Sequence, residues 1–548
     1  MKIFIPLFLF SLVISACSPQ ADNPQPILTA IKTSIPTAPI PTLLPPTQAP
    51  TEIPTPIQQP YLRLETLGPE LDQFPEGINP LTGLAVSHPE DLKTPAVLVS
   101  ISNSPVSAKP QAGLSFASQV NELFLGYGTT RYLSVFYGER ARRISDQGGD
   151  CLTQPVTALP VNWIGNRVWL DENENGQQDD WEVGVPGVCL DLINQLSGEV
   201  IASTGTTSNG YYFFDLENLN QTGQYAVRIE LPKKLDISTP NIGFEDLDSD
   251  VNPDNLTAPF SPSSGGFDHL DIGLVGIGEL EFSFLPNDIA PERTYVGPIR
   301  SGRLSYNDFG QLFPTGCLVF ASAGADILPQ LDPCELIFGQ PGSDSPNTAL
   351  LDVDYLREIS ERNHNPLVPV NYSGNLFSPK IPQSGLPALV IKQYFHQYSQ
   401  ARWEYQPISG TYLRFTDDLD GSGLLHPDVD RLTNRQLEFE NVIFLLADYS
   451  IYRKNQYDIE LCCGLEGWAF LFRDGNLYKI RWSTNNRQWE AENGFHRPIK
   501  FIGADKQPFP LKPGNSWISL FTTQSSVTEQ IAGEWLALFS PPDDSAYE

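Results

Sequence analysis

One stretch, Asp171 to Glu182, constrains the fold of this chain more than any other. It reads Asp-Glu-Asn-Glu-Asn-Gly-Gln-Gln-Asp-Asp-Trp-Glu, with oxygen-bearing side chains at positions 1, 3, 5, 9 and 12 and glycine at position 6. This is the spacing of a calcium loop, in which position 7 contributes a backbone carbonyl and the last Glu can bind through both oxygens. We therefore expect a structural calcium ion, and the alternative is a solvated acidic turn. The predicted ligands are Asp171, Asn173, Asn175, Gln177, Asp179 and Glu182.

The segments on either side of this loop indicate strands and not the two helices of an EF-hand. Residues 166–170 alternate between polar and apolar types, and residues 184–192 contain a proline and alternate again. Further short strands are expected at residues 210–214 and 225–229. Several short strands separated by turn residues predict a small β-sandwich.

These features resemble the B domains of SD-repeat surface adhesins, over nearly the whole of residues 161–276. The resemblance implies an immunoglobulin-like module that calcium stiffens and that serves as a rigid spacer. A second acidic run, with Asp246, Asp248 and Asp250, lies where that family has another metal-binding loop. Because this run lacks a terminal Glu in register, a second calcium site and a plain acidic turn both remain open.

The first residues predict export and a lipid anchor. Lys2 precedes an apolar run, residues 3–14, that is shorter than the roughly 20 residues needed to cross a bilayer. The run ends at Ile14-Ser15-Ala16-Cys17, which resembles a bacterial lipobox and implies a signal peptide of residues 1–16 with diacylglycerol on Cys17. The alternative is an ordinary signal peptide followed by an incidental cysteine. We expect a lipid-anchored protein on the extracytoplasmic face of the cell membrane.

Residues 17–60 carry a proline every few positions and form a predicted linker. Such a composition cannot bury a core and favours an extended polyproline II conformation.

The formal net charge of the chain is −31. That charge argues against nucleic acid as a partner, because phosphate recognition needs a basic face.

The globular part begins near residue 61 with a pattern that predicts an α/β layer. Residues 96–101 indicate a buried strand, residues 113–125 show a helical period, and residues 131–137 indicate another strand. A later strand is expected at residues 319–321 and a helix near residues 353–362. From residue 388 the pattern becomes antiparallel β, including a hairpin at residues 468–482 whose two-residue turn is Asp474-Gly475.

Four motifs of this part resemble the YerB-like bacterial lipoproteins, a family without an assigned function. They are Asn79-Pro80-Leu81-Thr82-Gly83-Leu84, Lys109-Pro110-Gln111-Ala112-Gly113-Leu114, Thr129-Thr130-Arg131 and Gly297-Pro298-Ile299-Arg300-Ser301-Gly302-Arg303. The fourth stands far downstream, so the adhesin-like module is interpreted as an insertion in a surface loop. The resemblance implies an N-terminal domain split into residues 61–160 and 277–385, and a C-terminal β domain at residues 386–540. The predicted fold class is α+β and multidomain, with an α/β domain interrupted by an immunoglobulin-like β-sandwich and followed by a mostly antiparallel β domain.

Six cysteines follow Cys17, and the sequence leaves their pairing open. Cys317 and Cys334 are the best local pair, although two buried free thiols remain an alternative. The adjacent Cys462 and Cys463 would need separate partners, unless they form a strained ring with each other. The remaining two are Cys151 and Cys189.

No nucleotide-binding, hydrolase or zinc-protease motif is visible, and the histidines are scattered. One basic cluster is a candidate site, because Arg131, Arg300 and Arg303 stand in the family-like motifs with Asn103 nearby. Arginine forks bind carboxylate or phosphate through two hydrogen bonds, so an anionic envelope ligand is expected. The alternative is internal salt bridges, for example to Glu122.

The sequence thus predicts a calcium-binding envelope protein that acts as a binding or scaffolding module. Its predicted partners are the membrane, through the lipid, and an anionic envelope ligand or a surface protein. The alternative is a cell-envelope enzyme that acts on a glycan or peptide through a site in the α/β domain. An enzyme needs an acid, a base or a nucleophile beside the arginines, and a binding module does not.

Overall fold

The computed structural model describes residues 65–145, 147–262, 270–280, 282, 293–339 and 348–547. The predicted signal peptide, Cys17 and the proline-rich linker therefore lie outside the described residues. Residues 58–548 belong to one compact unit, and the fold below is that of this unit. Within its described part, no helix combines the length and the apolar character that a membrane crossing requires.

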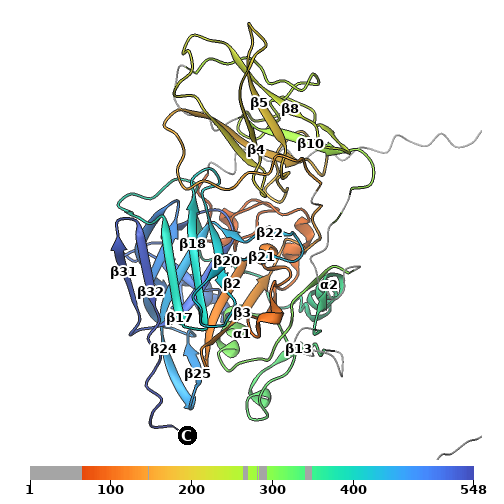
Figure 1. Cartoon of the computed structure of the whole chain (residues 1–548). Helices are drawn as coiled ribbons and strands as arrows, with labels where there is room; N and C mark the ends of the chain where they lie inside the picture. Colours follow the sequence, from red (N-terminus) through yellow and green to blue (C-terminus); the bar gives the residue numbers. More distant parts are fainter. Residues whose placement is uncertain are drawn as a thin grey trace, which may run out of the picture. The chain divides into compact units, whose positions relative to one another are not determined.

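Residues 163–276 form a β-sandwich of two sheets, as the sequence predicts (Figure 1). One sheet has the order β7-β4-β10-β9 and the other the order β6-β5-β8. Apolar side chains of both sheets, such as Val168, Leu190 and Val227, make up one buried core. The strands are β4 (Trp163–Leu170), β5 (Cys189–Asn194), β6 (Val200–Gly205), β7 (Tyr211–Asp215), β8 (Tyr225–Glu230), β9 (Leu235–Ile237) and β10 (Ile272–Gly276).

The rest of the chain, called the host, is built on a twelve-stranded sheet with the order β13-β12-β1-β3-β2-β30-β24-β26-β27-β16. Two further strands are attached, β25 to β24 and β28 to β27. The strands are β1 (Val97–Ser102), β2 (Gln119–Gly126), β3 (Thr129–Phe136), β12 (Cys317–Phe320), β13 (Pro333–Leu336), β16 (Leu386–Pro387), β24 (Asn441–Arg453), β25 (Gln456–Glu460), β26 (Glu466–Arg473), β27 (Asn476–Ser483), β28 (Lys500–Ile502) and β30 (Ser516–Thr522).

This sheet joins segments from both sides of the inserted sandwich. Strand β1 precedes the insert and pairs in parallel with β12, which follows it, with Val97 opposite Cys317. Strand β2 also pairs in parallel with β30, with Val120 opposite Trp517. One sheet therefore runs from the first host segment through to the C-terminal region, across the boundary expected near residue 386.

A second host sheet packs against the first. Its order is β20-β19-β18-β17-β32-β31, with β23 attached to β19, and Figure 1 shows β17, β18, β31 and β32 side by side. Aromatic rings fill the space between the two sheets, with Trp403 centred 5.4 Å from Trp517 and Phe395 centred 4.7 Å from Phe521. The strands are β17 (Val390–His396), β18 (Ser399–Gln406), β19 (Thr411–Asp417), β20 (Leu425–Pro427), β23 (Glu438–Phe439), β31 (Ser526–Ile531) and β32 (Glu534–Leu538).

The predicted helix at residues 113–125 is wrong. The structure has a short 3-10 turn, Leu114–Phe116, followed by strand β2, which forms an antiparallel hairpin with β3. Residues 120–124 are all buried, because β2 lies inside a sheet that is covered on both faces. A strand covered on both faces loses its polar–apolar alternation, so the spacing of its apolar residues imitates a helix. The predicted α/β layer is therefore not formed, and the host is mostly β.

Helices are few in the described residues. They are α1 (Tyr306–Leu312), α2 (Val353–Asn363) and α3 (Gln488–Asn493). The predicted helix at residues 353–362 is confirmed by α2, which begins where the Asp352 carboxylate accepts hydrogen bonds from the backbone nitrogens of Asp354 and Tyr355. Short 3-10 turns occur at Leu71–Gln73, Pro89–Lys93, Val106–Ala108 and Leu328–Gln330. Three small two-stranded ladders complete the fold, β11 (Tyr295–Val296) with β14 (Leu351–Asp352), β15 (Leu376–Phe377) with β29 (Pro510–Leu511), and β21 (Val429–Asp430) with β22 (Arg435–Gln436).

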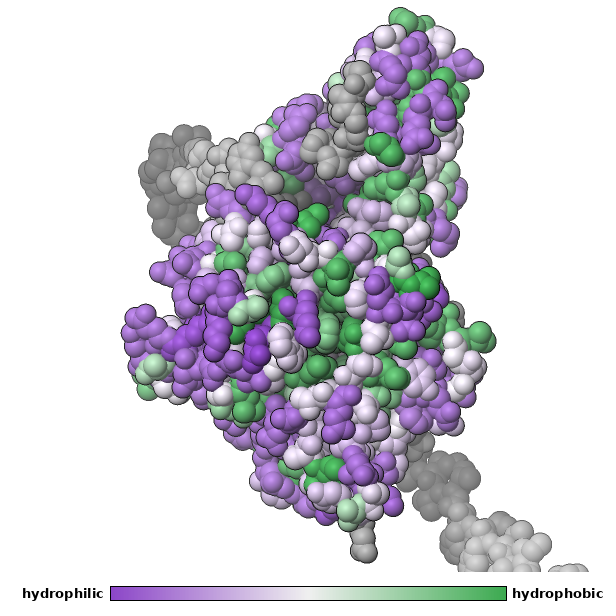
Figure 2. All heavy atoms as spheres, turned by 90° about the vertical axis from the view of Figure 1, so that its left-hand side faces the viewer, coloured by the Kyte–Doolittle hydropathy of each residue, from purple (hydrophilic) through white to green (hydrophobic). Residues whose placement is uncertain are grey.

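Other local predictions are confirmed. Strands β26 and β27 form the expected hairpin, and Asp474 and Gly475 have φ values of 50° and 67°, as the tight turn requires. Cys317 pairs with Cys334 across the neighbouring strands β12 and β13. Cys462 and Cys463 do not have the separate partners expected of them but form the alternative, a ring with each other. Cys151 pairs with Cys189, which the sequence left open, and so ties the segment before the insert to β5. Figure 2 shows one face of the molecule, where hydrophilic residues are interspersed with smaller hydrophobic groups.

Candidate functional site

The predicted calcium loop connects β4 to β5 and begins at a buried carboxylate. Asp171 is 1% exposed and is fixed by a hydrogen bond of 2.8 Å from its backbone nitrogen to the Leu274 carbonyl of β10. Its carboxylate accepts hydrogen bonds from the backbone nitrogens of Asn175 (3.0 Å) and Gly176 (2.9 Å), and from the Ser238 hydroxyl. Gly176 has φ 78°, and a Cβ there would lie 2.7 Å from the Thr239 carbonyl oxygen. Position 6 therefore requires glycine for both reasons.

The loop ends at a second buried carboxylate, that of Glu182, which is 2% exposed. It accepts hydrogen bonds from the backbone nitrogens of Glu172 (2.8 Å) and Asp179 (3.0 Å), so it closes the loop on itself. Burial raises the pKa of Glu182 to about 8, and the charges of Asp179 and Asp171 push it in the same direction. A cation beside these carboxylates would relieve that cost, because it favours the ionised form.

The middle of the loop is held by its own side chains. The amide nitrogens of Asn173 and Asn175 both donate to Asp179 Oδ2, at 2.8 and 2.9 Å, and the side chain of Gln177 donates to the Ile242 carbonyl. The carboxylates of Asp171, Asp179 and Glu182 do not converge within 4.8 Å of one another in the described structure. The predicted ligands therefore share one loop, and their carboxylates are not drawn together in it.

The second acidic run lies directly against this loop. Gln177 and Asp248 form a backbone bridge, and the backbone nitrogen of Gln178 donates to the Leu247 carbonyl at 2.7 Å. Asp248 is 5% exposed, its Oδ1 is buried without a hydrogen-bond partner, and burial raises its pKa to about 6. A buried carboxylate oxygen without a partner is costly, and a cation is the partner that would satisfy it.

The other two aspartates of this run, Asp246 and Asp250, have different surroundings from Asp248. Asp246 is exposed, and Asp250 accepts a hydrogen bond of 2.7 Å from the backbone nitrogen of Asp271. Burial raises the pKa of Asp250 to about 7, with the charge of Asp248 adding to the effect. Asp271 is fully buried and accepts from the side chain of Asn166, and sequence reasoning missed it because it stands alone outside any motif.

The donors of both loops fit calcium. Every candidate ligand is a carboxylate, amide or carbonyl oxygen, the set carries a net negative charge, and calcium prefers six to eight such oxygens in a flexible arrangement. Asp171, Asp179 and Glu182 would supply the charge, and Asp248 offers a free oxygen from the neighbouring run. The residues present thus match the ion that their spacing predicts.

The arginine cluster is brought together around Ser301. Arg131, on β3, is 4% exposed, and its Nη1 donates to the Ser301 carbonyl at 3.1 Å. Arg303 Nη1 donates to the Ser301 hydroxyl at 2.9 Å and to the Gly302 carbonyl at 2.8 Å. The backbone of Arg300 is placed by a hydrogen bond of 2.8 Å to the Ser100 carbonyl. Asn103 instead donates to the Thr130 hydroxyl, and its Oδ1 is buried without a partner.

The charge of this cluster is not balanced by the predicted carboxylate. Glu122 accepts hydrogen bonds from Thr130, Gln393 and Trp517 and lies 3.9 Å from Arg414, so its ion pair is with a different arginine. Among the described residues, neither Arg131 nor Arg303 forms an ion pair with a carboxylate. Burial lowers the pKa of Arg131 well below its ordinary value, and the neighbouring charges of Arg303 and Arg300 add to this, while its Nε is buried without a partner.

A cavity of about 400 Å³ also lies beside the calcium loop, between residues of the insert and of the host. Its lining includes Arg167 and Glu182 from the insert and Glu438, Glu440 and Lys512 from the host. Burial raises the pKa of Glu440 to about 7, and the nearby Lys512 charge opposes the rise. No sequence motif marks this cavity, because its lining comes from segments far apart in the chain.

Comparisons with known proteins separate the insert from the host at the same places as the fold. The model of the SdrD B-like domain matches residues 162–274. The N-terminal and C-terminal domains of DUF3048, a protein of unknown function, match residues 81–146 and 390–518.

Curated relatives match the insert. Serine-aspartate repeat-containing protein D of Staphylococcus aureus is 41% identical over 114 residues, which are 21% of this chain and 8% of that protein. Serine-aspartate repeat-containing protein C of the same species is 42% identical over 114 residues, again 21% of this chain and 12% of the relative. The chain thus spans about a tenth of the length of these relatives. The crystal structure of the YerB protein from Bacillus subtilis aligns over 81% of this chain and 96% of that chain, with a TM-score of 0.41 and 14% identity.

Fold and site define a mostly β protein in which a sandwich with an acidic loop interrupts a larger two-sheet host. The chain carries the N-terminal and C-terminal domains of the DUF3048 type, with an SdrD B-like domain inserted between them, as the sequence motifs predict. SdrD B-like domains are calcium-binding as a family.

Proposed function

We propose that this protein is a lipid-anchored, extracytoplasmic binding or scaffolding module whose inserted sandwich is stiffened by calcium. The observation that carries the proposal is the pair of adjacent acidic loops. The carboxylates of Asp171 and Glu182 are buried in the first loop, and Asp248 in the second has an oxygen without a hydrogen-bond partner. Two such loops cross-link strands when an ion satisfies them, and they repel each other when it does not. In this proposal the gain is rigidity and not chemistry.

The size of the effect follows from the affinity expected outside the cell. Extracellular calcium modules typically bind at about 10⁻⁴–10⁻³ M. At about 2 mM calcium, a site at the tight end stabilises the folded state by RT ln(1 + 20), or roughly 1.8 kcal/mol. The stabilisation acts on the insert, because the loop joins β4 to β5 and the backbone nitrogen of its first residue, Asp171, donates to the Leu274 carbonyl of β10.

Thermal unfolding of the purified chain with calcium and with EDTA tests this proposal. Calcium should raise the unfolding temperature of the insert transition, and Glu182→Gln should remove most of that difference. Glu199→Gln is the matched control, because Glu199 is an exposed acid on the same sandwich. Equal melting curves with calcium and with EDTA would show that no ion stabilises the loops.

Anion binding by the host is a second candidate function, favoured by the buried Arg131 beside Arg303 without a carboxylate partner. A phosphate or carboxylate ligand would satisfy the Arg131 Nε that no protein atom meets. We expect inorganic phosphate to bind in calorimetry, and Arg131→Gln to weaken it about tenfold or more, since a charge-assisted hydrogen bond contributes about 1.5–3 kcal/mol. Arg357→Gln is the control, because Arg357 is half-exposed on α2 and pairs with Glu361. Equal phosphate affinity in wild type and Arg131→Gln would exclude the cluster as the site.

The anchor is tested separately from both binding functions. Cys17→Ser should leave the protein unlipidated, so that it is released or remains unprocessed. Metabolic labelling with a fatty acid, followed by membrane fractionation, measures this directly. A substituted protein that is still labelled and membrane-bound would exclude lipidation at Cys17.

A further inference from the structure

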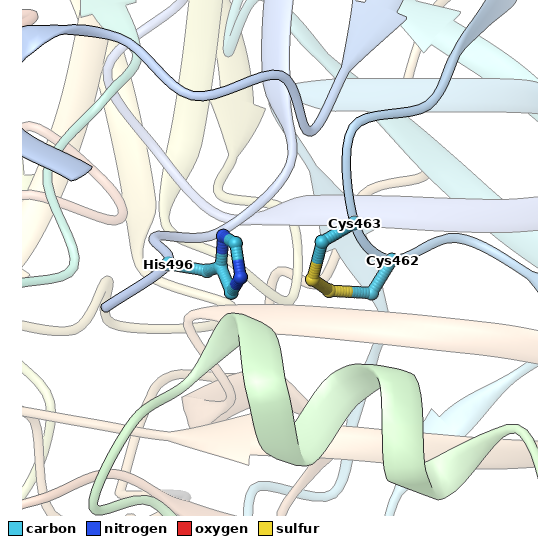
Figure 3. A group of neighbouring side chains, drawn as sticks. All are labelled: Cys462, Cys463 and His496. Atoms are coloured by element: carbon cyan, nitrogen blue, oxygen red, sulfur yellow. A yellow bond between two sulfur atoms is a disulfide. The ribbon is translucent and has the colours of Figure 1, made fainter. Parts of the chain in front are cut away.

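A cluster unrelated to the calcium loops lies in the host, where the loop after β25 meets the segment after α3. It contains Cys462, Cys463 and His496, all three half-buried, and their ligand atoms lie within 4.8 Å of one another. Figure 3 shows the His496 ring facing the two sulfur atoms, which are joined as a disulfide. Across the described residues, this is the one group of three or more such side chains that approach so closely.

The position of the two cysteines is fixed from both sides. Asp308 Oδ2, on α1, accepts hydrogen bonds of 2.7 Å from the backbone nitrogens of both Leu461 and Cys462. On the other side, the Thr484 hydroxyl donates to the Leu461 carbonyl at 2.8 Å, and the Gly464 nitrogen donates to the Thr484 carbonyl at 3.2 Å. The backbone around the cysteines is therefore held by helix α1 and by the residue that follows β27.

His496 brings an independent sign that this cluster has a ligand. Its Nδ1 is buried and has no hydrogen-bond partner. A metal-bound imidazole needs one free ring nitrogen, and the described structure gives this ring no carboxylate or carbonyl that would claim it. The residue next to it, Arg497, does not oppose a cation, because its guanidinium is engaged by Glu490 at 3.1 Å and Glu70 at 2.6 Å.

We propose that Cys462 and Cys463 in their dithiol form, together with His496, bind one thiophilic d¹⁰ cation, Zn²⁺ or Cu⁺. Two thiolates and one imidazole are the donor set that both ions prefer, and it is a poor set for calcium or magnesium, which take oxygen ligands. Three protein ligands leave a further position open. Gln311 Oε1 lies 3.8 and 3.6 Å from the two sulfurs. Half-burial of all three residues leaves a route for the ion from solvent.

The disulfide and the metal exclude each other, so the site exists only after reduction. A phosphine reductant and water convert the disulfide into two thiols and a phosphine oxide. Zn²⁺ then displaces one proton from each thiol, giving a zinc dithiolate with neutral His496 as the third ligand and two protons released. Cu⁺ binds the same deprotonated sulfurs, with the same release of protons.

Metal titration of the reduced full chain tests the proposal. The protein is reduced with a water-soluble phosphine and desalted without oxygen, and its accessible thiols are counted with Ellman's reagent. Zn²⁺ is then titrated against a colorimetric chelator, and Cu⁺ against bicinchoninate in a separate experiment. The wild type should bind one more equivalent of at least one of the two ions than the variant carrying both Cys462→Ser and Cys463→Ser. The other cysteines are common to both proteins, so the difference isolates this pair.

Single substitutions separate the imidazole from the sulfurs. His496→Gln should weaken the extra equivalent by at least about tenfold, the lower bound for disturbing even an outer-sphere partner of a metal. His426→Gln is the matched control, since His426 is exposed and pairs with Asp418 at 3.0 Å. Co²⁺ added to the reduced wild type should also give a sulfur-to-cobalt charge-transfer band that the double serine variant lacks, and both variants should keep the wild-type circular dichroism spectrum.

Three results would overturn the proposal. The first is the absence of an extra equivalent of either ion in the reduced wild type. The second is a pair of sulfurs that the phosphine does not open in the folded chain, because no thiolate is then available to a metal. The third is an affinity unchanged by His496→Gln, which would remove the imidazole from the site.

Discussion

Replacing Glu490 should make the free energy of unfolding of the host less dependent on pH. Glu490 lies on α3 and is 2% exposed, and its carboxylate accepts hydrogen bonds from Arg497 Nε at 3.1 Å and from Lys500 Nζ. Arg497 also reaches Glu70 at 2.6 Å, so the network fastens the first described segment to the C-terminal region. Burial alone would raise the pKa of Glu490, but the hydrogen bonds and charges of Arg497 and Lys500 outweigh burial and lower that pKa to about 2.

The magnitude follows from the difference between this value and the ordinary value of 4.5. At 1.36 kcal/mol for each tenfold change in proton affinity, ionised Glu490 contributes about 2–3 kcal/mol, once screening by nearby solvent is allowed for. Because the folded pKa is the lower one, the contribution is fully present above pH about 4.5 and is lost as the pH falls through about 2. At pH 3 about half of it should remain.

The assay is urea unfolding of wild type and Glu490→Gln between pH 7 and pH 3, followed by tryptophan fluorescence. The free-energy difference between the two proteins should shrink by about 1–2 kcal/mol over this range, because other carboxylates titrate equally in both. Glu492→Gln is the control, as Glu492 is exposed on the same helix. A difference that stays constant, or that grows as the pH falls, would refute the assignment of the shift to Arg497 and Lys500.

Three further outcomes follow from the fold. Asp352→Ala should lower the free energy of unfolding by about 1 kcal/mol, because α2 loses the side chain that caps its first turn, and a value near zero in urea titration would contradict the cap. Trp517→Ala should cost about 3–5 kcal/mol, because this ring is fully buried between the host sheets, whereas Trp468→Ala, which removes a 42% exposed ring, should cost far less in the same assay. Deleting residues 161–275 and joining the ends by a short Gly-Ser loop, with Cys151→Ser to remove the orphaned thiol, should leave a host that unfolds cooperatively, because β1 and β12 pair without the insert. Loss of a cooperative calorimetric transition would show that the host needs the insert to fold.

The sequence predicted elements whose signal is local. The Asp171–Glu182 spacing and the Asp474-Gly475 turn each depend on residues a few positions apart, as does the pattern of residues 353–362. The structure has the loop, the hairpin and the helix where they were expected. The β-sandwich followed for the same reason, since the strands expected for it have an alternating or apolar pattern with turn residues between them.

Prediction failed where long-range pairing overrode the local pattern. The apolar residues of 113–125 have helical spacing, yet residues 119–126 form strand β2, which pairs with β3 and β30. Because β2 is covered on both faces, residues 120–124 are all buried. Strand β30 follows β2 almost four hundred residues later in the chain. The local spacing of apolar residues around β2 therefore could not reveal this pairing. The partner of Glu122 escaped for the same reason, because Arg414 comes from the second host sheet.

The two metal-binding hypotheses differ in the same way. Calcium loops carry their ligands within one short segment, because a flexible chain can wrap a large ion with alternate residues, and such a site is visible in the sequence. A thiophilic site needs few ligands, and these come from any segments that the fold brings together. Cys462 and Cys463 alone suggested only a question about disulfides, since the third member, His496, is separated from them by β26, β27 and α3. The β26–β27 hairpin lies between the cysteines and His496 in the sequence, and its two strands run antiparallel. Only the folded structure shows that the imidazole lies beside the sulfurs.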